Sequence, residues 1–122
     1  MKRFVFMISD RTGLTVESLG NSLLSQFEDV VFEKETMPYI DTPEKAKKVL
    51  EKINACPKAS NPIVFITLID SEIADYFKQA NACVLDLFGT FLNPIEKELG
   101  EKSSYTVGKT HALANIKTYD HR

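Results

Sequence analysis

The sequence predicts an α/β fold built around a parallel sheet of four strands. Two observations lead to this class. The nearly unbroken apolar runs FVFMI at residues 4–8 and IVFITLI at residues 63–69 are typical of strands that are buried on both faces. Between such runs, apolar residues recur every three or four positions, which is the spacing of helices that bury one face. Because the chain has 122 residues, 43% of them apolar, we expect one core and one α/β domain over residues 1–100.

The first strand and the first helix come from the stretch FVFMISDRTGLTVESLG at residues 4–20. Residues 4–8 predict a central strand of the sheet. We expect the helix to follow Gly13 and to cover about residues 14–27, because the apolar residues in this range fall on one helical stripe. The predicted stripe consists of Val16, Leu19, Leu23 and Phe27, with Leu24 beside them.

A more polar strand and a well-marked helix form the next unit. Residues 30–37 predict a strand at the edge of the sheet, since their centre carries the charged run EKE. The stretch DTPE at residues 41–44 predicts a helix start, with a capping side chain, a proline near the first position and an acid facing the helix dipole. The buried stripe of this helix consists of Ala46, Val49, Leu50 and Ile53.

The third and fourth strands are expected at residues 63–69 and 82–87. Asp70 and Ser71 cap the helix between them, and its predicted inner face consists of Ile73, Tyr76, Phe77 and Ala80. Cys83 lies in an apolar run and is expected in the core. Asp86 ends the fourth strand, where it serves either a site or a turn. We expect a turn at residues 88–90 and a short helix between Asn93 and Gly100.

Right-handed crossovers between these strands give the order 2-1-3-4, with helices on both faces in a three-layer, Rossmann-like or flavodoxin-like arrangement. In such a sheet, ligands bind beyond the carboxyl ends of the strands, where the strand order reverses. This point lies between the first and third strands. We expect residues 9–13, Asp70 with Ser71, and the turn at residues 88–90 to face it.

The loop of Ser9, Asp10, Arg11, Thr12 and Gly13 is the candidate site. The start of a helix favours an anion, and Ser9, Arg11 and Thr12 carry donors for a phosphate or a carboxylate. Asp10 would repel an anion unless it binds a cation, caps the helix or takes a proton from a substrate hydroxyl, which makes it the candidate catalytic residue. The loop is equally explained without function, with Asp10 or Thr12 as the helix cap and Gly13 as a turn residue.

Composition and spacing exclude several classes of function. With 17 acidic and 15 basic residues, the chain has no electrostatic signature of a nucleic-acid or membrane partner. No apolar run approaches the roughly 20 residues of a membrane span. Cys56, Cys83, His111 and His121 lack the spacing of metal ligands, so we expect no metal site and, without a signal peptide, a soluble cytoplasmic protein with reduced thiols.

The common nucleotide-binding loops are absent from the sequence. The candidate loop fits neither G-x-G-x-x-G nor G-x-x-x-x-G-K-[ST]. Gly108, Lys109 and Thr110 are similar to the end of the second pattern, but Ser103 stands where that pattern requires glycine. Lys109, Thr110 and His111 therefore form a polar cluster that is either a solvated loop or part of a site.

Three stretches resemble the bacterial regulatory proteins of phosphoenolpyruvate synthase and of pyruvate, phosphate dikinase. FVFMISDRTGLTVESLGNSLLSQF, from residue 4, resembles their opening, in which a strand ending in I-S-D-x-T-G leads into a helix ending in L-x-x-Q-F. LDLFGTFLNPIEKELG, at residues 85–100, is similar to a segment of theirs that ends in P-L-E-x-x-L-G. Gly108, Lys109 and His111 match their G-[RK]-x-H, which Tyr119 and Arg122 follow. The three blocks lie in the family's order and span nearly the whole chain.

The resemblance implies an ADP-dependent kinase that inactivates the synthase or dikinase by phosphorylating a threonine. It also implies a phosphate-dependent pyrophosphorylase that removes this phosphate and releases pyrophosphate. ADP and phosphate would be the cofactors of the full-length protein, and a homodimer is expected. The family's P-loop lies in a later part, so this chain should contain no cofactor-binding residues. Residues 101–122 then form a polar extension that leads toward a missing C-terminal P-loop kinase domain.

Three hypotheses about function follow. In the first, the domain helps to bind the target protein or phosphate through Ser9, Asp10, Arg11, Thr12 and Gly13, with Lys109 and His111 brought near in the full-length protein. In the second, it is a non-catalytic module for dimerisation or for docking of the target enzyme. In the third, it is a small independent anion-binding domain.

Overall fold

A computed structural model describes residues 2–57 and 60–103 of the chain and confirms the predicted α/β architecture. Its four strands form one parallel sheet in the predicted order β2-β1-β3-β4. The elements along the chain are β1 (Lys2–Ser9), α1 (Leu14–Leu24), β2 (Val31–Met37), α2 (Pro43–Asn54), β3 (Ile63–Thr67), α3 (Ser71–Phe77), β4 (Cys83–Asp86) and α4 (Leu87–Leu99). Within these described residues, no helix combines the length and the apolar character that crossing a bilayer requires.

β1 lies at the centre of the sheet, between two parallel neighbours. It pairs with β2 along its length, from Lys2 opposite Val31 onward, and with β3 from Val5 opposite Ile63 onward. Its residues from Val5 to Ser9 are buried, which explains why the strand shows no polar alternation in the sequence. The prediction of a central first strand is therefore confirmed.

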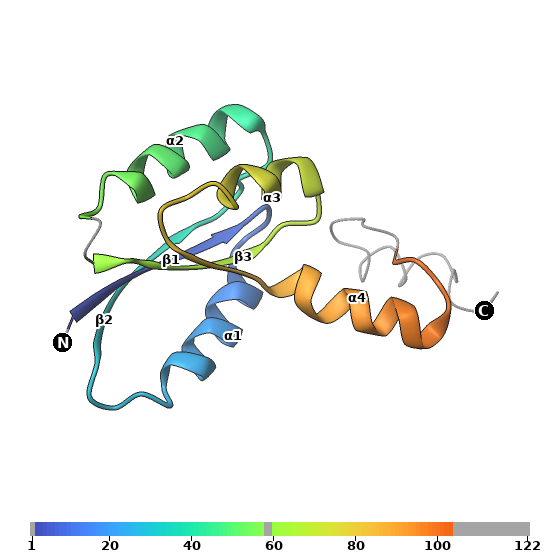
Figure 1. Ribbon diagram of the computed structural model, residues 1–122, viewed down its shortest axis with the longest axis horizontal. Helices are drawn as coiled ribbons and strands as arrows, with labels where there is room; N and C mark the ends of the chain where they lie inside the picture. The colour runs from blue at the N-terminus through green and yellow to red at the C-terminus, as the bar shows by residue number, and fades with distance from the viewer. Residues whose placement is uncertain (1, 58–59, 104–122) are drawn as a thin grey trace.

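The reversal of strand order places helices on both faces of the sheet. The chain steps from β1 to β2 in one direction and then returns across β1 to β3, so right-handed crossovers put α1 on one face and α2 and α3 on the other (Figure 1). One core lies under α2 and α3 and the other under α1. The predicted caps are present, since the Thr42 hydroxyl accepts a hydrogen bond from the Lys45 N–H and the Asp70 carboxylate accepts one from the Glu72 N–H.

α1 is shorter than predicted and turns a different face to the sheet. It ends at Leu24, and its buried residues are Val16, Gly20 and Leu24, whereas Leu23 is 44% exposed and Phe27 is 60% exposed. The reason is Gly20, where an added Cβ would lie 3.1 Å from the Met7 Cε atom and 3.3 Å from the Phe65 ring. The helix approaches the sheet most closely at this glycine, so Leu23 and Phe27 of the predicted stripe remain exposed, while Leu19 packs against the edge of the core.

α4 corrects the prediction for residues 88–100. There is no turn at residues 88–90, because α4 begins directly after β4, and Asp86 caps it by accepting a hydrogen bond from the Gly89 N–H at 2.9 Å. Pro94 lies inside the helix instead of opening it. The helix is therefore capped at Asp86, seven residues before Asn93, where the sequence predicted its start. Gly100 ends the helix in a left-handed conformation, as expected.

Cys83 is exposed, so its predicted place in the core is wrong. β4 is the edge strand of the sheet, and its side chains alternate between exposed and half-buried positions. A short apolar run alone does not distinguish an edge strand, with one open face, from a central one.

Replacing Gly20 with leucine tests the close approach of α1 to the sheet. We expect Gly20→Leu to lower the free energy of unfolding by about 1–3 kcal/mol, because the added atoms would overlap Met7 and Phe65. The exposed Ser18 offers the matched control Ser18→Leu, which should change stability little. Urea denaturation of both variants measures the difference, and equal effects would contradict the packing described here.

Candidate functional site

The carboxylate of Asp10 joins the ends of β1 and β3. Asp10 directly follows β1, and its Oδ2 atom accepts a hydrogen bond from the backbone N–H of Ile69, beyond β3, at 2.9 Å. This contact places Asp10 where the strand order reverses, as the sequence predicts. A cleft of about 710 Å³ opens at this point, and it is lined by Asp10, Arg11, Asp41, Ile69, Asp70, Ser71 and Ile73.

Backbone and side-chain hydrogen bonds fix the conformation of the β1–α1 loop. Ser9 is only 5% exposed, and its hydroxyl oxygen accepts a hydrogen bond from the Arg11 N–H at 3.0 Å. The exposed Thr12 accepts one from the Leu14 N–H through its Oγ1 atom at 3.4 Å. The hydroxyls of Ser9 and Thr12 thus support the loop itself, and of the five predicted loop residues Asp10 and Arg11 line the cleft.

Gly13 occupies the N-cap position of α1, so neither Asp10 nor Thr12 is the helix cap. Its φ of 92° is a left-handed conformation that favours glycine. An added Cβ would also lie 2.9 Å from the Cγ2 atom of Thr36 in β2. The loop therefore requires glycine here for both conformation and space, and the Asp10 side chain is left to reach Ile69.

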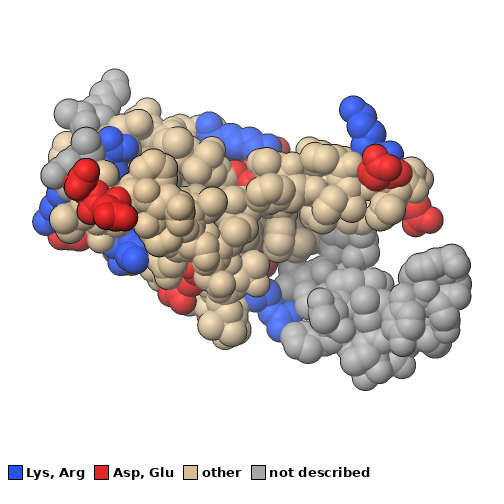
Figure 2. Space-filling view, turned by 90° about the horizontal axis from the view of Figure 1, so that it is seen from below, with Lys and Arg blue, Asp and Glu red and all other residues tan. Residues whose placement is uncertain are grey.

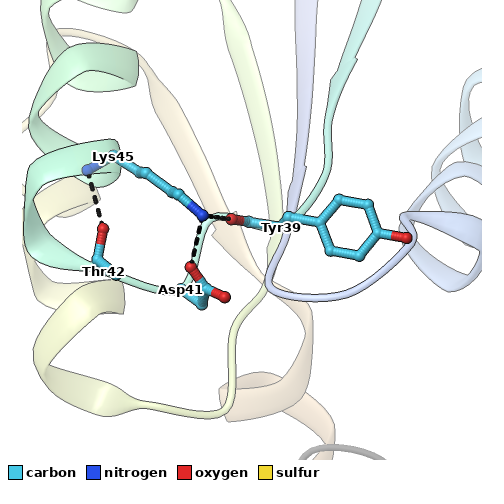
Figure 3. Close-up of polar contacts among 4 residues, drawn as sticks. All are labelled: Tyr39, Asp41, Thr42 and Lys45. Carbon is cyan, nitrogen blue, oxygen red and sulfur yellow. Dashed lines mark hydrogen bonds and ion pairs between the residues drawn. The ribbon is translucent and has the colours of Figure 1, made fainter.

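The β2–α2 loop brings Asp41 to the cleft, which the sequence analysis missed. Tyr39 donates a backbone hydrogen bond to the Arg11 carbonyl, and Ile40 donates one to the Ser9 carbonyl, both at 2.8 Å. The Lys45 ammonium then binds the Tyr39 carbonyl at 3.2 Å and the Asp41 carboxylate at 2.9 Å (Figure 3). The predicted pairing of the first two strands could have indicated this position of Asp41, because the loops that follow neighbouring parallel strands lie at the same edge of the sheet.

The three carboxylates around the cleft differ in their surroundings. Burial raises the pKa of Asp10 above its ordinary value, although the hydrogen bond from Ile69 and the Arg11 charge partly oppose this shift. The hydrogen bond from Lys45 lowers the pKa of Asp41. The Asp70 carboxylate accepts a hydrogen bond from the Glu72 N–H and caps α3. Asp41 and Asp70 thus have partners outside the cleft, and Asp10 is the acid whose neutral form burial favours.

Among the residues that the structure describes, this arrangement suits proton transfer and the binding of an anion through one cation, Arg11. A half-buried carboxyl group with a raised pKa is a suitable acceptor for the proton of a hydroxyl. Three carboxylates make the cleft acidic, so a phosphate would depend on the Arg11 guanidinium, which matches phosphate in shape and charge. Within residues 2–57 and 60–103, no group of three or more His, Cys, Asp or Glu side chains is placed to hold a metal ion.

Other predicted site residues lie away from the cleft or outside the described part of the chain. Lys109 and His111 are among the residues that the structure does not describe, so their proximity to the loop stays a prediction. Asp86 caps α4. Phe88 and Gly89 face the carboxyl ends of β3 and β4 from the first turn of that helix, beside a smaller cavity of about 180 Å³ that Ser71 also lines.

The raised pKa of Asp10 predicts how stability depends on pH. The native state holds this proton more tightly than the unfolded chain, so the stability that Asp10 contributes is fully present below its unfolded pKa and is lost as pH rises through its native pKa. Asp10→Asn keeps an acceptor for Ile69 without the charge. We therefore expect the variant to be at least as stable as the parent at pH 7, with the difference shrinking toward pH 4.

Urea denaturation at the two pH values measures this difference. Asp10→Ala is the control, because it removes the acceptor and should cost roughly 1 kcal/mol or more at both pH values. An Asp10→Asn variant that is less stable than the parent at pH 7 would contradict the burial cost assigned to this carboxylate.

Comparison with known proteins agrees with the resemblance seen in the sequence. The profile of the kinase/pyrophosphorylase family matches residues 5–122. A protein of Legionella pneumophila (strain Corby) named "putative phosphoenolpyruvate synthase regulatory protein" is 56% identical over 124 residues, which cover 100% of this chain and 46% of the relative. Proteins of the same name from Hahella chejuensis and Marinobacter nauticus are 48% and 47% identical, again over 100% of this chain and 46% of the relative. The chain thus spans about half the length of these relatives, and it belongs to the kinase/pyrophosphorylase family.

Proposed function

We propose that this chain is the N-terminal domain of a bifunctional enzyme that regulates phosphoenolpyruvate synthase by reversible threonine phosphorylation. The observation that carries the proposal is the family match over residues 5–122, together with the names of the relatives that are 47–56% identical. The enzyme would use ADP to phosphorylate the target and phosphate to remove the phosphoryl group as pyrophosphate. ADP would bind in the part of the protein outside these residues. A cytoplasmic location and a homodimer belong to the same proposal.

Within this function, the cleft at the ends of β1 and β3 receives the target segment or phosphate. Its volume of about 710 Å³ is ample for a few side chains of a bound peptide. Arg11 pairs with phosphate, either free or on the modified threonine, and Asp10 takes up the proton of a hydroxyl. Ser9, Thr12 and Gly13 hold these two residues in place.

The acidic surroundings of the cleft favour this reading over an independent anion-binding domain. Among the described residues that line the cleft, three carboxylates face one guanidinium, so we expect inorganic phosphate to bind weakly there. Millimolar or weaker affinity in calorimetry is the expected result, and micromolar binding would restore the independent anion-binding hypothesis.

A chimaeric protein tests the function at full length. In it, residues 1–122 of this chain replace the 124 matched residues of the Legionella relative. Incubated with ADP, the chimaera should inactivate phosphoenolpyruvate synthase and leave a phosphorylated threonine that mass spectrometry detects. Phosphate should then restore activity with release of pyrophosphate. A folded chimaera that does neither, beside an active Legionella parent, would refute the proposal.

Two arginine variants of the chimaera test the role of the cleft. Arg11→Gln removes the cation that lines it, and we expect the phosphate-dependent reaction to slow by about tenfold or more. Arg3→Gln is the matched control, because Arg3 lies near the other end of β1, where its guanidinium donates to the Asn61 carbonyl at 3.2 Å. Equal rates for the two variants would remove Arg11 from the site.

A further inference from the structure

β4 and α4 leave apolar side chains exposed on one side of the molecule. Leu85 is 40% exposed, Phe91 55%, Ile95 50% and Leu99 68%, and Cys83 is exposed as well. We call these five residues the β4–α4 surface. Leu87, the buried first residue of α4, belongs to the core under α1 and shows on which side of the sheet this surface lies.

The strand order explains why the β4 part of this surface is open. Cys83 pairs with Ile63 and Leu85 pairs with Phe65, so these side chains point to the same face of the sheet as the core under α1. In the order 2-1-3-4, the crossover from β1 to β2 is the one that runs over this face of the sheet. Its helix, α1, packs on β1 and β3. The described part of the chain therefore provides no helix over β4 on this side.

α4 continues the apolar surface away from the sheet. At about 100° per residue, Leu87, Phe91, Ile95 and Leu99 fall on one stripe of the helix. No charged residue occurs from Leu87 to Ile95, and the charged residues of α4 are Glu96, Lys97 and Glu98 in its last turns. Figure 2 shows charged side chains gathered at the far end of the described part of the chain, beyond a stretch without charge. α4 also projects beyond the layers formed by the other helices (Figure 1). Large apolar side chains that are exposed together along a strand and the helix that follows it are typical of an interaction site.

We infer that the β4–α4 surface is the packing site for the remaining part of the same family protein. The relatives match this chain over its whole length, yet the matched part is 46% of each of them, so more than half of each protein needs a surface to pack on. Because the surface lacks charge over most of α4, the contacting element should present apolar side chains, as an amphipathic helix does. The inference requires the family membership and does not depend on the proposed activity.

The native thiol of Cys83 reports on this surface directly. In the 122-residue chain it should react rapidly with a thiol reagent, since it is exposed. In the chimaera with the Legionella relative, we expect its reaction to be at least about tenfold slower, because the packed segment must move away first. Cys56 packs against the opposite core, so Cys56→Ser, with any cysteines of the Legionella part also changed to serine, isolates the Cys83 signal.

Helix variants of the chimaera show whether the protection comes from this surface. Ile95→Ser combined with Phe91→Ser should restore the reactivity of Cys83, whereas Lys97→Ser, from another side of α4, should not. In the 122-residue chain, the double variant should keep the parent's circular dichroism spectrum, because both side chains are already exposed.

Three results would overturn the inference. The first is an equal rate of Cys83 modification in the chain and in the chimaera. The second is protection that increases with protein concentration alongside self-association in sedimentation, which would assign the surface to a second copy. The third is a slow reaction in the dilute 122-residue chain, which would mean that the chain covers the surface itself. None of these measurements uses ADP or the target enzyme, so they are independent of the proposed activity.

Discussion

The position of β1 between two parallel neighbours is the constraint on which the rest of the structure depends. It requires the strand to be apolar on both faces, and it brings the loops after β2 and β3 to the two sides of the loop after β1. Hydrogen bonds then join the three loops, through Tyr39 and Ile40 on one side and through Asp10 and Ile69 on the other. The cleft is thus a direct consequence of the strand order.

The fold explains where Asp10 lies, but it does not explain why this residue is an acid. An asparagine would also accept the hydrogen bond from Ile69, and it would avoid the cost of partly burying a charge. The neighbouring acids have structural partners, with Asp41 held by Lys45 and Asp70 capping α3. Within the described part of the chain, Asp10 is thus the cleft acid that has no such partner side chain or helix to cap, and for this reason the proposed function assigns the proton-accepting role to it.

The sequence was sufficient for features that are set by local or strongly periodic signals. The central strands, a capped helix start within residues 41–44, the cap at Asp70, the strand order and the place of Asp10 were all predicted and are confirmed. The errors arose where a distant contact, or a competing local cap, decides between local alternatives. Gly20 turns α1 so that Leu23 stays outside, and the Asp86 cap starts α4 before the motif around Pro94. Asp41 was missed because its place in the cleft depends on the pairing of β2 with β1.

The most direct test of the central claim is the titration of the Asp10 carboxyl carbon by NMR, with and without the proposed target enzyme. In the free chain, we expect a pKa above that of an ordinary aspartate, because the carboxylate is partly buried beside Ile69. Saturating phosphoenolpyruvate synthase should change this pKa, because the cleft loses further water when the target covers it. An ordinary or lowered pKa in the free chain, or a value that the target enzyme leaves unchanged, would contradict a working site at this edge of the sheet.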